Sequence, residues 1–96
     1  MMVLADSAIL ARIEGRVQGV WFRAWTHEQA EARGLSGWVR NCRDGSVEAL
    51  FAGPIDQVRD MIAACHDGPK AARVLTVHET LASPPNAPGF RQLPTE

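Results

Sequence analysis

The distribution of apolar and polar residues along the chain predicts several short strands and two helices. Strands are expected at residues 8–14, 35–41, 46–52 and 71–81, with a short edge strand at 90–93. The Asp44-Gly45 pair between the second and third of these segments favours a tight β-hairpin. Three prolines between residues 83 and 89 exclude a regular strand there and indicate a loop.

Both predicted helices have clear ends, but the apolar side of the first is weak and that of the second is well defined. The segment Trp21–Arg33 is rich in Ala, Glu, Gln and Arg, and Gly34 ends it. The second helix starts at Pro54, which suits a first turn, and stops at Asp67-Gly68-Pro69. The predicted core positions are Phe22, Thr26 and Ala30 in the first helix and Ile55, Val58, Ile62 and Cys65 in the second. Trp21 and Trp25 are expected to form a second aromatic pair.

The order of these elements is strand–helix–strand, repeated, with a possible extra strand. This order predicts an α+β fold, a ferredoxin-like sandwich of split βαβ units. A four- to five-stranded antiparallel sheet would carry both helices on one face. The length of 96 residues suits a single domain spanning residues 1–96.

The charge balance restricts the kinds of partner. With 10 Lys and Arg against 11 Asp and Glu, the net charge is −1, which disfavours nucleic acids and electrostatic binding to membranes. Residues 1–10 lack the basic start and long apolar stretch of a signal peptide. The two cysteines, Cys42 and Cys65, are expected to be free thiols in a reducing cytoplasm. An anionic ligand would therefore need a local binding site.

Several kinds of catalytic site have no support in the sequence. His27, His66 and His78 are far apart and lack the spacing of metal ligands. The acidic residues are scattered, so a pair of catalytic carboxylates is not expected. Cys42 has no base near it in sequence that would make it a nucleophile.

The glycine-bracketed segment Gly15–Gly19 is the strongest candidate for an anion site. It lies between a predicted strand and a predicted helix, where glycines with positive φ let backbone N–H groups converge on an anion. Arg23 falls in the first helical turn, where the helix dipole disfavours a cation unless an anion is bound. A tight turn with a solvated arginine would also explain this pattern.

Asn41 is the second candidate. It ends a predicted strand just before the hairpin, a place where asparagine commonly serves only the turn. In a ferredoxin-like sheet, the first two strands run parallel and end on the same side. The Gly15–Gly19 loop and Asn41 would then face one cleft, which the pattern permits without requiring it.

Two longer stretches make the chain resemble an acylphosphatase. Gly15-Arg16-Val17-Gln18-Gly19-Val20-Trp21-Phe22-Arg23 is similar to the first signature of that family. Residues 37–48, Gly-Trp-Val-Arg-Asn-Cys-Arg-Asp-Gly-Ser-Val-Glu, are similar to the second, and Gly68-Pro69 with Ala72-Arg73-Val74 fits the spacing downstream. The resemblance covers residues 8–80 and implies the same ferredoxin-like fold.

The resemblance implies hydrolysis of an acyl phosphate to a carboxylate and inorganic phosphate, with no metal or other cofactor. It assigns the phosphoryl group to the backbone of Gly15, Arg16, Val17, Gln18, Gly19 and Val20 together with the side chain of Arg23. Asn41 would position the attacking water. The expected partner is a small-molecule acyl phosphate, and the expected form is a cytoplasmic monomer.

Some positions depart from the family pattern or stay open. Cys42 stands where many relatives carry a hydroxyl residue, so a hydrogen bond near Asn41 is expected to be weaker. Residues 82–96 match only loosely. Trp21 either lines the entrance for the acyl group or is simply packed or exposed, while Trp25 and Trp38 are expected to be structural.

Two other functions compete with hydrolysis. A non-catalytic phosphate- or anion-binding regulatory module on the same fold would bind phosphate without turnover. An RNA-binding ferredoxin-like domain would expose aromatic residues on adjacent strands within a basic surface. Strands 35–41 and 46–52 offer only Trp38 and Phe51, and the chain is slightly acidic.

Overall fold

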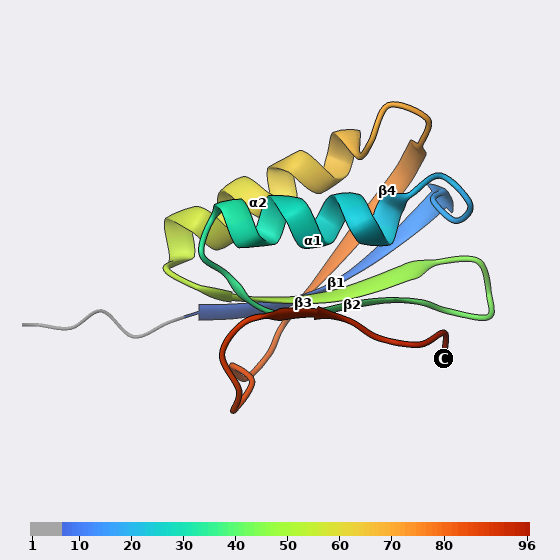
Figure 1. Ribbon diagram of the computed structural model, residues 1–96. Helices are drawn as coiled ribbons and strands as arrows, with labels where there is room; N and C mark the ends of the chain where they lie inside the picture. The colour runs from blue at the N-terminus through green and yellow to red at the C-terminus, as the bar shows by residue number, and fades with distance from the viewer. Residues whose placement is uncertain (1–6) are drawn as a thin grey trace, which may run out of the picture.

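In this computed structural model, residues 7–96 are described and form a five-stranded sheet with two helices on one face (Figure 1). The elements are β1 (Ser7–Arg16), α1 (Phe22–Ala32), β2 (Ser36–Asn41), β3 (Val47–Gly53), α2 (Ile55–Asp67), β4 (Arg73–Leu81) and β5 (Phe90–Gln92). The expectation that the chain starts without a signal peptide falls mainly on residues 1–6, which lie outside the described residues. Neither helix in residues 7–96 has the length and apolar character needed to span a membrane.

The topology confirms the ferredoxin-like prediction. The strands lie in the order β4-β1-β3-β2-β5, and β3 pairs antiparallel with both β1 and β2. The first two strands therefore run parallel to each other, and both finish at the same end of the sheet. The loop after β1 and the hairpin after β2 share this end of the molecule (Figure 1).

The prediction of a wholly antiparallel sheet is wrong at β5. This strand pairs parallel with β2, with Gly37 opposite Phe90 and Val39 opposite Gln92. The chain runs down β4 antiparallel to β1, then reverses through the proline-rich loop at residues 82–89. It therefore rises along β2 in the same direction as that strand, which makes the sheet mixed.

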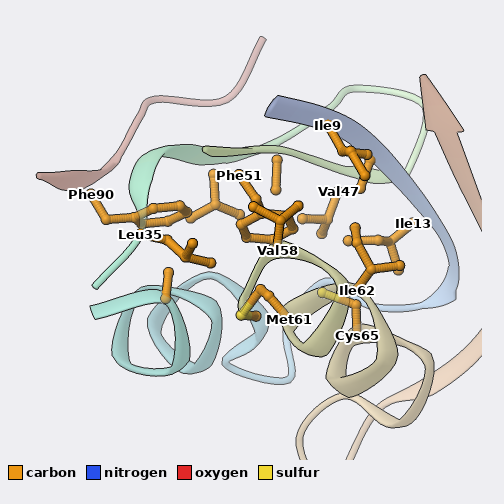
Figure 2. Close-up of a cluster of buried hydrophobic side chains, with 14 of the residues drawn as sticks. Ile9, Ile13, Leu35, Val47, Phe51, Val58, Met61, Ile62, Cys65 and Phe90 are labelled. Carbon is orange, nitrogen blue, oxygen red and sulfur yellow. The ribbon is translucent and has the colours of Figure 1, made fainter. Parts of the chain in front are cut away.

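The core fills the space between the helices and the sheet. Figure 2 shows Met61 and Cys65 of α2 pointing toward Phe51 and Ile13 of the sheet. The edge strand β5 contributes Phe90, whose ring stacks on Phe51 with centroids 5.8 Å apart. Burial of these side chains supplies most of the driving force for folding.

The core-facing side of α2 differs from the prediction at one position. Val58, Ile62 and Cys65 are buried as expected, but Ile55 is exposed and Met61 is buried instead. The buried residues follow an i, i+3, i+4, i+7 pattern, which places Ile55 at the edge of the stripe in the first turn.

The start of α1 is fixed by an aromatic anchor. Phe22, Thr26 and Ala30 are buried, as predicted. Phe22 packs edge-on against Trp25 with ring centroids 5.3 Å apart, so the expected pairing of Trp25 with Trp21 is wrong. Trp21 is the N-cap residue of α1 and is exposed, because the chain turns sharply before the helix begins.

Candidate active site

A cavity of about 300 Å³ opens at the end of the sheet where β1 and β2 finish. Its lining comes from the β1–α1 loop (residues 17–21), the first turn of α1, the end of β2 and the end of β5. The lining residues are Val17, Gly19, Trp21, Phe22, Arg23, Ala24, Asn41 and Gln92. Segments that are far apart in sequence therefore meet at one concave surface.

Gly15 shapes the path of the chain into the β1–α1 loop. The pairing between β1 and β4 shifts register between Glu14 and Gly15, and Gly15 has a φ of 130°. A Cβ atom at this position would lie 2.3 Å from the carbonyl oxygen of Arg73 and 2.8 Å from the amide nitrogen of Leu75. Only glycine allows β4 to approach this closely, and the register shift leaves Leu75 of β4 as the extra, unpaired residue of a β-bulge opposite Gly15.

The β1–α1 loop and the first turn of α1 present a run of unpaired backbone donors. Within the described residues, the N–H groups of residues 17–24 donate to no backbone carbonyl. The first helical bond at this end runs from the Trp25 N–H to the Trp21 carbonyl oxygen, at 2.9 Å. Gly19 lies in the left-handed region at φ 72°, which lets the amides on either side turn toward one region. Such donors at a helix N-terminus attract an anion.

Arg23 carries a positive charge into the same cavity without a counter-ion. It is half-buried, and no carboxylate of residues 7–96 forms an ion pair with it. One guanidinium nitrogen, Nη1, lies 3.5 Å from the carbonyl oxygen of Leu93. The first turn of α1 also contains no acidic residue. The remaining guanidinium donors are free to bind an anion in a forked geometry.

Asn41 also lines the cavity, from the last position of β2. Its backbone is fixed by pairing with Val47 and by a hydrogen bond from the Glu96 N–H to the Asn41 carbonyl oxygen, at 3.0 Å. The side-chain carboxamide forms no hydrogen bond within the described part of the chain. It can donate to one group and accept from another at the same time.

Gln18 has a role that the sequence did not predict. Its Nε2 donates to the carbonyl oxygens of Cys42 and Ser46, both at 2.7 Å. These bonds tie the β1–α1 loop to the β2–β3 hairpin, so the two walls of the cavity are held together. The sequence motif contains Gln18 but gives no sign that its side chain would reach the hairpin.

The structure brings half of the predicted site residues into the cavity lining. Val17, Gly19, Arg23 and Asn41 line it. The others support it from outside: Gly15 lies at the bulge, Arg16 is the exposed last residue of β1, Gln18 binds the hairpin, and Val20 packs against the core.

Gln92 was missed by sequence reasoning. It lies at the end of β5, in the segment where the family pattern is weakest, and lines the cavity because β5 pairs with β2. No local signal in the sequence indicates this placement.

Within residues 7–96, no group of three or more His, Cys, Asp or Glu side chains lies close enough together to hold a metal ion.

Comparison with known proteins identifies the family of this chain. A family model described as Acylphosphatase matches residues 9–92. The chain belongs to the acylphosphatase family. The acylphosphatase of Rhodospirillum rubrum is 53% identical over 87 residues, which cover 91% of this chain and 96% of that protein.

Two solved acylphosphatases have the same fold. The Coxiella burnetii structure superimposes with a TM-score of 0.89 at 30% identity, covering 93% of this chain and 94% of that one. The Bacillus subtilis structure gives 0.87 at 32% identity, covering 91% and 98%. The chain is thus an enzyme of the acylphosphatase family, and this membership supports hydrolysis of acyl phosphates.

Proposed function

We propose that this enzyme hydrolyses an acyl phosphate without a metal ion, using the β1–α1 loop and Arg23 to bind the phosphoryl group and Asn41 to orient water. The observation that carries the proposal is the convergence of Arg23, which has no carboxylate partner among the described residues, with Asn41 and the unpaired loop amides at one cavity. The donors are fixed before substrate arrives, so little reorganisation is needed when charge develops.

The chemistry of an acyl phosphate suits such a small set of groups. The water oxygen attacks phosphorus, the bond from phosphorus to the acyl oxygen breaks, and both water protons stay with the phosphate. An acyl phosphate dianion and water thus give a carboxylate and dihydrogen phosphate. A carboxylate is a weakly basic leaving group, so no side chain has to protonate it. A substrate phosphate oxygen accepts the proton from the attacking water.

Asn41 fits the water-positioning role better than an acidic residue would. A carboxylate at this position would repel a dianionic phosphate at short range. The neutral carboxamide of Asn41 can accept a hydrogen bond from water through Oδ1 and donate one through Nδ2, without repelling the phosphate. Catalysis then depends on positioning and on charge stabilisation by Arg23, as in phosphoryl transfer generally.

The decisive experiment measures acetyl phosphate hydrolysis in the presence of EDTA for wild type and two variants. Asn41→Ala should lower kcat by roughly 100-fold because positioning is lost, while the inhibition constant of inorganic phosphate stays within about twofold of wild type. Arg23→Ala should weaken phosphate inhibition and lower kcat/KM together, because the charge contacts both substrate and transition state.

Matched controls separate these roles from general damage. Asn86→Ala lies in the proline-rich loop, outside the cavity lining, and Arg59→Ala lies on the exposed side of α2; both should hydrolyse acetyl phosphate at the wild-type rate. Normal turnover by Asn41→Ala would remove it from the mechanism. Phosphate binding by wild type without any turnover would favour the non-catalytic anion-binding module.

A further inference from the structure

Trp21 is the most exposed aromatic surface at the cavity. Its side chain is 81% exposed, and it lines the cavity together with Arg23 and Asn41. The other apolar residues of the lining offer little surface to a ligand, because Val17 and Phe22 are buried in the core and Ala24 is small. A ligand that extends out of the phosphate site therefore meets one large apolar group, the indole of Trp21.

The backbone of Trp21 is in a conformation that its side chain disfavours. With φ 66° and ψ 23° it is the one non-glycine residue in the described part of the chain with positive φ. Left-handed geometry is uncommon for a bulky residue and is normally left to Gly, Asn or Asp. Outliers of this kind cluster at functional sites.

Folding gives no reason for tryptophan at this position. The indole belongs to neither hydrophobic cluster and forms no aromatic pair or cation–π contact within residues 7–96. Its large apolar surface stays in water, and glycine or asparagine would satisfy the turn with less strain. The backbone strain and the exposed apolar surface are offset only if the ring contacts a ligand.

We propose that Trp21 is a specificity-determining residue whose indole stacks on the acyl group of the substrate and favours aromatic over small acyl groups. The inference rests on the proposed hydrolysis, since it names the class of acyl phosphate that this site takes. With the phosphoryl group held by Arg23 and the loop amides, the acyl group projects toward the cavity opening, which Trp21 borders. Stacking on an aromatic ring is selective for flat, apolar groups.

The test compares benzoyl phosphate with acetyl phosphate as substrates. Trp21→Asn removes the ring but keeps a residue that tolerates left-handed geometry, so the loop keeps its shape. We expect the ratio of kcat/KM for benzoyl phosphate to that for acetyl phosphate to fall about tenfold, mainly through KM of benzoyl phosphate. Trp21→Phe should retain most of the wild-type ratio.

The matched control is Leu81→Asn, which removes another exposed apolar side chain, 85% exposed, at the end of β4 and outside the cavity lining. It should leave the ratio unchanged. An unchanged ratio in Trp21→Asn, whether both substrates slow equally or neither slows, would overturn the proposal.

Binding of substrate analogues distinguishes failure of this inference from failure of the proposed function. Wild type should bind benzylphosphonate several-fold more tightly than methylphosphonate in calorimetry, and Trp21→Asn should bind the two equally. If wild type hydrolyses neither acyl phosphate, the hydrolytic proposal fails, and this binding difference still decides the role of Trp21. Equal binding of both phosphonates by wild type would overturn it.

Discussion

Gly15 is the residue whose replacement should most directly damage the site. Because a Cβ atom there would clash with the backbone of β4, Gly15→Ala should lower the free energy of unfolding by about 2–3 kcal/mol. Gly19→Ala adds a Cβ into open space and carries only the strain of positive φ, about 1–2 kcal/mol. Urea unfolding measures both. Equal losses would mean that β4 can move away from residue 15.

The two cysteines should differ in reactivity. Burial raises the pKa of the Cys65 thiol to about 12, against a weaker opposing effect of Arg33, so almost no thiolate forms at pH 8. Cys42 is partly exposed. We expect a disulfide reagent to modify one thiol in the native protein and two in denaturant, with peptide mapping placing the first on Cys42. Faster modification of Cys65 would contradict its burial in the core.

At the scale of one element, α1 carries an unsatisfied polar group in its buried face. The Thr26 hydroxyl is fully buried and has no hydrogen-bond partner among residues 7–96. Thr26→Val keeps the branched shape and a similar helix propensity, so it should stabilise the protein by about 1 kcal/mol. Thermal unfolding would show this as a higher Tm.

A second threonine provides the control for this substitution. The Thr76 hydroxyl on β4 donates to Glu14 Oε1 at 3.1 Å, so Thr76→Val removes a hydrogen bond that exists. It should leave Tm unchanged or slightly lower. A lower Tm for Thr26→Val would indicate that its hydroxyl finds a partner in solution.

Comparison of the predicted and observed helices and strands shows which features the local sequence determines. The ends of the helices and strands were predicted to within about two residues, because hydrophobic periodicity, glycine and proline are signals in the local sequence. The direction of β5 was not predictable in this way, because it depends on how the chain reverses after β4. The exposure of Ile55 was missed because its spacing alone fits the apolar stripe.

For the whole molecule, the net charge of −1 together with the local positive site leads to a prediction about phosphate binding. Inorganic phosphate should bind at the cavity and stabilise the native state; at ten times its Kd the gain is about 1.4 kcal/mol. For a chain of this size that raises Tm by roughly 5–10 °C. Arg23→Ala should abolish the rise, while chloride at equal ionic strength should not reproduce it in wild type. A similar rise in Arg23→Ala would place the phosphate elsewhere.

The candidate site was partly predictable because the topology of the whole sheet determines which segments lie near one another. The parallel course of β1 and β2 in a ferredoxin-like sheet permitted the glycine-bracketed loop and Asn41 to face one cleft, and the resemblance to acylphosphatases assigned both to one site with Arg23. The contribution of Gln92 and the bonds made by Gln18 were not, because both depend on contacts between segments far apart in sequence. The left-handed backbone of Trp21 likewise follows from how the loop meets α1.

The participation of β5 in the cavity has a consequence for the order of events during folding. The lining extends from Val17 to Gln92, so it is complete only when two segments separated by most of the chain have met. Closing so long a loop costs entropy that local contacts do not repay, which slows such steps. A ribosome-bound chain that has not yet released β5 has no complete site, however well its first hairpin and helix have formed. Activity should therefore appear only with the final docking step of refolding, after the helical signal has recovered.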